Sequence, residues 1–221
     1  MAFTSIALSG SQRFVLFVVL CVVAYYIPVL NIPLLWVEVF FHEISHGIAA
    51  LLSGGSIVSI HLLFNGSGYC VTQGGNAFLI GFSGYAGSAL WGLMIYLVSE
   101  CLSRKASTYA VGLLVILLGL TLILWVRDLL TLLVIATLIF ALGFILFNSR
   151  YKFINHVLGF LGVFVMLDAV RSPLVLLDGV SIGDGAALAN SYGMPEFFWV
   201  LVWFLISLMC IYIAWRMSSK S

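Results

Sequence analysis

Long apolar stretches constrain what this chain can fold into more than any other feature of its sequence. Each is long enough to cross the roughly 30 Å hydrocarbon core of a bilayer as a helix. Of the 221 residues, 63% are hydrophobic and 8% are charged, values typical of a polytopic membrane protein. We therefore expect an all-α polytopic membrane protein with about seven transmembrane helices. The stretches lie at residues 13–30, 34–52, 78–102, 107–126, 129–148, 153–173 and 194–216.

Composition and charge limit the partners and the setting of the chain. The net charge is +1 and no basic cluster is present, which argues against nucleic-acid binding. Three of the four cysteines, at positions 21, 70, 101 and 210, lie within apolar stretches, and we interpret those three as packing residues. No repeat or separate soluble segment is visible, so residues 1–221 are expected to form a single membrane-embedded domain. We expect a multi-pass protein of the plasma (inner) membrane, surrounded by lipid, and the oligomeric state is left open.

The connection between the second and third stretches differs from them in composition, since it is rich in glycine and strand-favouring residues. Strand-favouring residues on both sides flank the turn Asn65-Gly66-Ser67-Gly68, and Gly74-Gly75 ends the second arm. This pattern predicts a short β-hairpin. Two roles remain open for it. It is either a plain connection, or it offers an exposed strand edge to which an extended substrate segment binds by β-augmentation.

The second stretch contains the motif with the clearest chemistry, Phe41-His42-Glu43-Ile44-Ser45-His46-Gly47. In a helix, His42 and His46 lie one turn apart on one face, about 6 Å along the axis, so both imidazoles can bind one cation. Two neutral imidazoles suit zinc. Glu43 lies about 100° around the helix, where its carboxylate can act on a water molecule as a general base.

A purely structural reading of this motif is that the three side chains hydrogen-bond to one another and only fix how helices pack. The membrane context argues against it, because each ionisable group inside a span costs on the order of 2 to 3 kcal/mol even on lenient scales. A bound cation offsets that cost. The sequence therefore favours a metal site.

Asp168 is the first candidate for a third ligand. It lies well inside the sixth stretch, where an uncompensated carboxylate is expensive and is by default a functional candidate. The alternative is an ion pair with Arg171, three residues later on the same helix. Asp178 and Asp184 follow as competitors, and Asp184 also suits the N-cap of a short helix. We assign the third ligand to Asp168, with Asp184 and Asp178 as alternatives.

Together these residues resemble the site-2 protease family of intramembrane zinc metallopeptidases, most closely its small multi-pass branch of bacteria and plants. Asp168 and the segment beginning at Asp184 resemble later acidic positions of that branch. In better-studied relatives the third ligand is the aspartate of a Leu-Asp-Gly motif, whose letters recur at Leu177-Asp178-Gly179. The other matching elements are Phe41-His42-Glu43-Ile44-Ser45-His46-Gly47, Leu51-Leu52-Ser53-Gly54-Gly55 and Gly84-Tyr85-Ala86-Gly87-Ser88-Ala89.

The resemblance implies a zinc-dependent endopeptidase that hydrolyses peptide bonds of membrane-associated substrates, with a transmembrane protein as the expected substrate. His42, His46 and one aspartate would hold Zn²⁺, and Glu43 would be the catalytic base. Two other functions use the same residues. One is a transporter or ion-binding protein whose polar groups line a permeation path, although no paired repeats with broken helices are visible. The other is a catalytically silent membrane scaffold that binds and stabilises partners.

Overall fold

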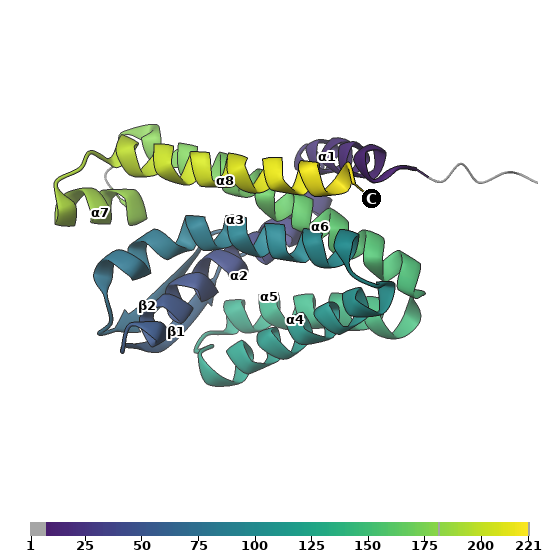
Figure 1. Ribbon diagram of the computed structural model, residues 1–221. Helices are drawn as coiled ribbons and strands as arrows, with labels where there is room; N and C mark the ends of the chain where they lie inside the picture. The colour runs from purple at the N-terminus through teal and green to yellow at the C-terminus, as the bar shows by residue number, and fades with distance from the viewer. Residues whose placement is uncertain (1–7, 181, 221) are drawn as a thin grey trace, which may run out of the picture.

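Helices dominate the structure. The computed structural model describes residues 8–180 and 182–220, and a single hairpin interrupts the series of helices in that part of the chain (Figure 1). The elements are α1 (Gly10–Tyr25), α2 (Pro28–Leu52), β1 (Ser56–Leu62), β2 (Gly68–Gln73), α3 (Ala77–Cys101), α4 (Arg104–Leu124), α5 (Leu129–Asn148), α6 (Tyr151–Arg171), the 3₁₀ helix η1 (Ser172–Asp178), α7 (Asp184–Tyr192) and α8 (Glu196–Ser218).

The expected fold class is confirmed, with one qualification on the number of spans. Among the described residues, six helices are long and apolar enough to cross a membrane: α2, α3, α4, α5, α6 with η1, and α8. The remaining expected span, the first stretch at residues 13–30, corresponds to α1, which has 16 residues. At about 1.5 Å per residue it is shorter than the hydrocarbon core is thick.

The connection between the first two helices is shorter than the sequence indicates. The expected stretches 13–30 and 34–52 place a break at residues 31–33, but α2 already begins at Pro28, and Pro33 lies inside the helix. Proline is well tolerated in the first turn, because the first backbone N–H groups of a helix have no partner within it. Pro33 removes one further hydrogen bond, whose acceptor would be Val29 at the exposed start of the helix.

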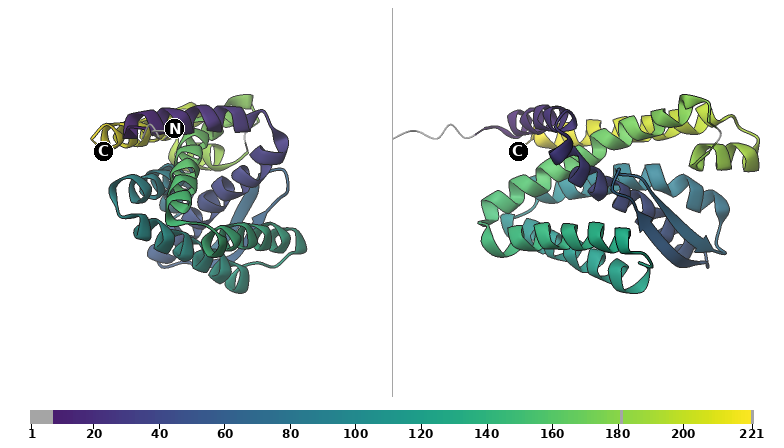
Figure 2. Two further views of the ribbon diagram at one scale, coloured as in Figure 1. Left: turned by 90° about the vertical axis from the view of Figure 1, so that its right-hand side faces the viewer. Right: turned by 180° about the vertical axis from the view of Figure 1, so that it is seen from behind.

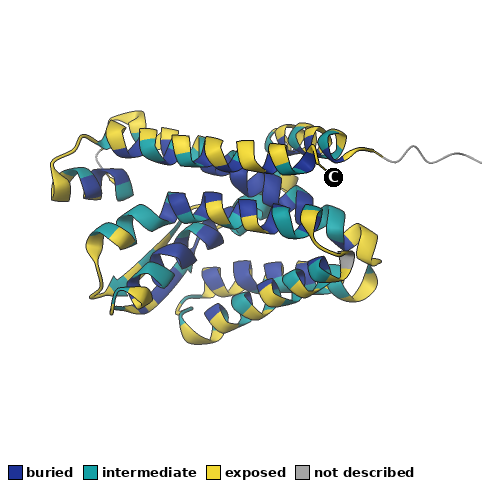
Figure 3. Cartoon of the chain, in the orientation of Figure 1, coloured by how far each residue is buried: buried dark blue, intermediate teal, exposed yellow. Residues whose placement is uncertain are grey.

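The helices lie in three tiers, with the metal-motif helix in the middle one. In Figure 1, α8 and α1 lie above α2, α3 and α6, and the antiparallel pair α4 and α5 lies below. The two further views show α6 crossing obliquely from the α4–α5 pair to the α8 tier (Figure 2). Outward faces are largely exposed, whereas faces toward the middle tier are buried (Figure 3). In the apolar core of α2, 61% of residues are buried, against 28% in α4 and α5, so the motif is well enclosed.

Small residues set how closely α3 approaches its neighbours. The spacing of Gly84, Ser88 and Gly92 predicts one face that admits close packing. A Cβ atom on Gly92 would lie 2.8 Å from the Met166 backbone nitrogen and 2.9 Å from the Gly162 carbonyl oxygen of α6. The α3–α6 crossing therefore depends on glycine. Gly84 faces a different neighbour, the histidines of α2.

The predicted hairpin is present and lies beside α2. β1 and β2 pair antiparallel from Ser56 opposite Gln73 to Leu62 opposite Gly68, with a register shift between Ile57 and Ser59. On the other edge of β1, the Ile60 N–H donates to the Trp125 carbonyl oxygen at 3.0 Å. Two residues later, the Leu62 N–H donates to Thr131 Oγ1 at 2.9 Å. The outer edge of β1 is therefore partly occupied by the α4–α5 connection and the start of α5.

Candidate metal centre

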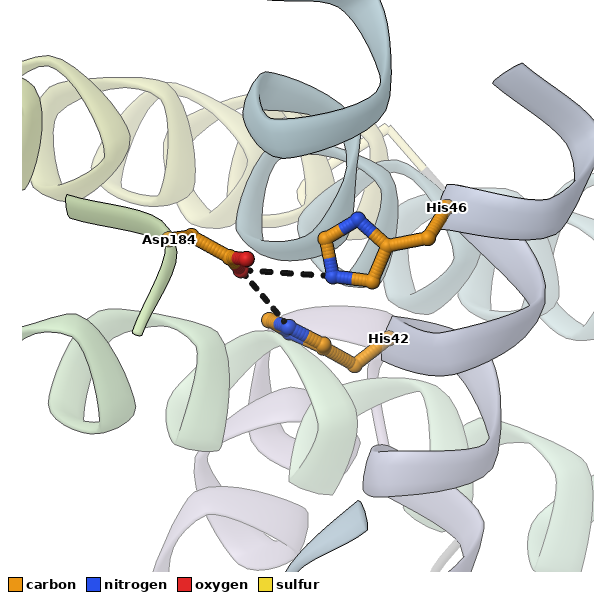
Figure 4. A group of neighbouring side chains, drawn as sticks. All are labelled: His42, His46 and Asp184. Atoms are coloured by element: carbon orange, nitrogen blue, oxygen red, sulfur yellow. Dashed lines mark hydrogen bonds and ion pairs between the residues drawn. The ribbon is translucent and has the colours of Figure 1, made fainter. Parts of the chain in front are cut away.

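His42 and His46 project from one face of α2 and meet a carboxylate from a distant segment. Their ring centroids are 4.7 Å apart. Asp184 Oδ2 lies 3.1 Å from His42 Nε2 and 3.2 Å from His46 Nε2. Figure 4 shows the carboxylate pointing between the two rings. These three residues form a group whose ligand atoms all lie within 4.8 Å of one another.

Asp184 reaches the histidines because of how α7 begins. It is the first residue of this nine-residue helix, and Gly183 before it has φ of +106°, a conformation that glycine adopts readily. Burial would raise the pKa of Asp184, but hydrogen bonds and charges from His42 and His46 outweigh burial and hold its pKa well below the usual range. The carboxylate is therefore available as a ligand at neutral pH.

The tautomer of His46 is set by a backbone contact. Its Nδ1 lies 2.6 Å from the Ile80 carbonyl oxygen of α3. Because a carbonyl oxygen only accepts, Nδ1 carries a proton and donates it, so Nε2 is the nitrogen that would bind a metal. Metal-binding histidines typically make this kind of contact through their second nitrogen.

Gly84 of α3 provides the space in which the two imidazoles stand. A Cβ atom at this position would lie 2.5 Å from Nε2 of both His42 and His46. Any larger residue would therefore collide with the ring atoms that would bind a metal. The regularly spaced small residues of α3 therefore have two roles. Gly84 leaves room for the histidine rings, and Gly92 allows α3 to pack closely against α6.

The three side chains fit a zinc ion. Two imidazole nitrogens and one carboxylate oxygen are a common zinc donor set, with an open position left in catalytic sites. Ligand atoms about 2.0 to 2.1 Å from a tetrahedral zinc stand about 3.3 Å from one another. The observed 3.1 and 3.2 Å between Asp184 and the histidines match that spacing.

Glu43 lies beside this group, at a cavity of about 350 Å³ that His42 also lines. The Glu43 side chain is buried between α2 and the hairpin, where a Cβ on Gly68 of β2 would lie 3.1 Å from Glu43 Cγ. A buried carboxylate that faces a cavity next to two metal-type ligands has the position of a general base. The structure thus brings together His42, Glu43 and His46 with a third acid.

That third acid is Asp184, the alternative, and not Asp168, the first choice. Asp168 is buried on α6, where its Oδ1 accepts a hydrogen bond from the Tyr25 hydroxyl at 2.6 Å and from Arg171 Nη2 at 3.1 Å. The Arg171 guanidinium compensates its charge, so no metal is needed to explain a buried aspartate there. The structure thus groups Asp184, rather than Asp168, with the two histidines, and the identity of the third metal ligand stays a prediction.

Asp178, the other alternative, lies outside the group. It is exposed at the end of η1, and its Oδ1 accepts a hydrogen bond from the Val180 N–H at 2.7 Å. The letters Leu177-Asp178-Gly179 therefore mark a turn, in which Gly179 has φ of +83°. The Leu-Asp-Gly letters therefore do not bring Asp178 to the two histidines.

Comparison with known proteins finds one matching family. A family model described as Peptidase M50B-like matches residues 15–214. The chain belongs to this family. The M50B-like peptidases are the site-2 protease family, so the resemblance seen in the motifs is confirmed. No curated protein and no solved structure matches the chain.

Family membership and fold together describe this M50B-like chain as a multi-pass integral membrane protein of a metallopeptidase family. Sequence reasoning missed two contributions to its centre, the Ile80 carbonyl and the space at Gly84. A backbone carbonyl leaves no trace in the residue type. Gly84 did carry a signal, since it belongs to the interval of small residues, but that interval was interpreted as helix packing.

Proposed function

We propose that this M50B-like protein is an intramembrane zinc endopeptidase that hydrolyses peptide bonds of transmembrane protein substrates. The observation that carries the proposal is the meeting of His42, His46 and Asp184 beside the cavity that Glu43 lines. A structural histidine–aspartate cluster would need neither a carboxylate next to it nor a cavity in front of it. We place the protein in the plasma membrane, as the bacterial side of the family resemblance implies.

The chemistry divides between the metal and the chain. Zinc held by the three ligands would polarise the scissile carbonyl and make a water molecule more acidic. Glu43 accepts a proton from that water as its oxygen attacks the carbonyl carbon, and then delivers the proton to the leaving nitrogen. The Ile80 carbonyl keeps the His46 ring in the orientation and tautomer that ligation requires.

Strand β2 is the part of the hairpin that suits an extended substrate. In the described part of the chain, β2 pairs with β1 alone, whereas the outer edge of β1 is partly occupied. Gly68, the first residue of β2, lies against Glu43 and lines the same cavity. A segment paired with β2 would therefore run toward the general base. A transmembrane substrate helix must unwind before cleavage, because the peptide bonds of an intact helix are shielded from attack. Pairing with β2 would hold the unwound segment extended.

Replacing Glu43 by Gln tests the proposal. The purified protein is reconstituted in liposomes with a pool of single-span peptides, and new peptide ends are detected by mass spectrometry. Wild type is expected to cut peptides within or beside the membrane segment. Glu43→Gln is expected to lose cleavage by about 100-fold or more and to keep its zinc, because the substitution removes the base and leaves the ligands.

Asp178→Asn, at an exposed carboxylate outside the cavity, is the control and should cleave as wild type does. Cleavage by Glu43→Gln at the wild-type rate would contradict the peptidase mechanism. A wild type that cuts nothing would contradict it as well and would favour the silent scaffold. Zinc-dependent ion flux through the liposomes without cleavage would instead favour the transporter.

A further inference from the structure

Tyr85 is a side chain of the centre that neither the motif nor the ligand set includes. It follows Gly84 on α3, and its ring meets the His42 ring edge-on, with centroids 4.5 Å apart and planes at 78°. On another side it packs against Trp203 of α8, at 4.8 Å between centroids. Trp203 is itself held in place, since its Nε1 donates to the Phe82 carbonyl oxygen at 3.0 Å. The Tyr85 ring is thus held between α2 and α8.

The hydroxyl of Tyr85 is available for a ligand. Tyr85 lines the 350 Å³ cavity together with His42 and Glu43. Its hydroxyl is close enough to feel the charges of Asp184 and Glu43, yet it makes no hydrogen bond to any residue that the structure describes. A phenol carries one O–H donor, and at the cavity this donor is free to bind a ligand.

Two other donors around the cavity are already engaged, whereas the Ser172 hydroxyl, which also lines it, has no partner among the described residues. Arg171 is bound to Asp168 through both Nε and Nη2. In the hairpin turn, the Ser67 hydroxyl donates to Asn65 Oδ1 at 2.8 Å. Tyr85 differs from Arg171 and Ser67 because its hydrogen is uncommitted, and from Ser172 because its ring packs directly against His42, a metal-type ligand.

We propose that Tyr85 is a catalytic residue whose hydroxyl donates a hydrogen bond to the oxygen of the scissile carbonyl while negative charge develops there. This inference rests on the proposed peptidase function. As the water oxygen bonds to the carbonyl carbon, the C=O electron pair moves onto the carbonyl oxygen and the water proton goes to Glu43. Tyr85 stabilises the charged oxygen and keeps its own proton. The pair returns when the C–N bond breaks and Glu43 protonates the nitrogen.

The test is Tyr85→Phe, which keeps the ring contacts with His42 and Trp203 and removes only the hydroxyl. Cleavage of the best single-span peptide from the liposome pool is measured as a function of its concentration. We expect kcat to fall about 100-fold, the usual cost of losing one donor to a developing oxyanion. KM and zinc content should stay within about two-fold of wild type, because the contact forms in the transition state.

Tyr96→Phe is the matched control, because Tyr96 is a buried tyrosine farther along α3 and outside the cavity. A second readout needs no turnover: a phosphinic peptide analogue of the same substrate, a tetrahedral mimic, should bind about 100-fold more weakly to Tyr85→Phe and normally to Tyr96→Phe. Wild-type kcat and analogue affinity in Tyr85→Phe, with an active wild type and an inactive Glu43→Gln, would overturn the role of Tyr85 alone. Inactivity of the wild type would overturn the peptidase proposal itself.

Discussion

Gly84 is the residue at which the packing of two helices and the chemistry of the centre meet. Its missing side chain leaves room for Nε2 of both His42 and His46, each 2.5 Å from where a Cβ would stand. His46 is tied to α3 through the Ile80 carbonyl, so its ring has little freedom to move aside. A single methyl group should therefore disturb ligation without a large loss of buried area.

We expect Gly84→Ala to weaken zinc binding by about 10- to 100-fold, a range typical of changes next to metal ligands. Competition with a chromophoric chelator measures this affinity. Gly112→Ala on α4 is the control, because a Cβ there meets nothing within 4 Å and should leave zinc affinity unchanged. Wild-type zinc affinity in Gly84→Ala would show that the imidazoles do not bind metal in the observed arrangement.

Residue-level prediction worked best where the chemistry is local in sequence. His42, Glu43 and His46 lie within one helical turn, so their relative positions follow from helix geometry alone. Asp168 was chosen because a buried carboxylate needs compensation, and that physical premise holds. Its compensation comes from Arg171, three residues away, and from Tyr25 of α1, which no spacing pattern reveals.

At the scale of the secondary-structure elements, strand β1 of the hairpin is tied to helix α5 by a set of contacts around Asp128, which we call the joint. This aspartate is the N-cap of α5, where its side chain accepts hydrogen bonds from the Thr131 N–H at 2.9 Å and the Thr131 hydroxyl at 2.7 Å. Its other contact is His61 Nδ1 of β1, at 2.8 Å. Thr131 in turn holds the Leu62 N–H of β1. One cap thus connects strand and helix, and His61 serves there rather than as a metal ligand.

Asp128→Ala should therefore loosen β1 as well as α5. Loss of an N-cap typically costs about 1 kcal/mol, which is about a five-fold change in an opening equilibrium. We expect the Ile60 and Leu62 amides to exchange with deuterium about five-fold faster, measured by mass spectrometry or NMR. Ser103→Ala, which removes the N-cap of α4, should leave these two amides unchanged.

The same joint should respond to acid. Partial burial would raise the pKa of Asp128, but hydrogen bonds from Thr131 and the neighbouring His61 lower it overall. A carboxylate with a depressed pKa stabilises the fold above its unfolded pKa, near 4, and that contribution is lost as pH falls through the folded value. With each observed exchange rate divided by the intrinsic amide rate at the same pH, the protection of Ile60 and Leu62 should thus fall progressively below about pH 4 in wild type and depend less on pH in Asp128→Ala. If Ile60 and Leu62 exchanged at the wild-type rate in Asp128→Ala at neutral pH, Asp128 would not connect β1 with α5 as described.

At the scale of the whole molecule, the centre joins segments that are far apart in the chain. His42 and His46 come from α2, Gly84 and Ile80 from α3, and Asp184 from α7, after all the spans except α8. Hydropathy predicted the spans and turn residues predicted the hairpin, because both signals are local. The placement of Asp184 at α2 depends on packing of α7 against α3 and α8, which has no local signature in the sequence.

The central claim is that His42, His46 and Asp184 form a zinc site, and metal analysis of the purified protein tests it most directly. Wild type should contain one zinc per chain, by inductively coupled plasma mass spectrometry. Asp184→Ala and His46→Ala should lose it, whereas Asp168→Ala and Asp178→Ala should retain it, because neither side chain belongs to the group. Full zinc content in Asp184→Ala together with its loss in Asp168→Ala would contradict the account.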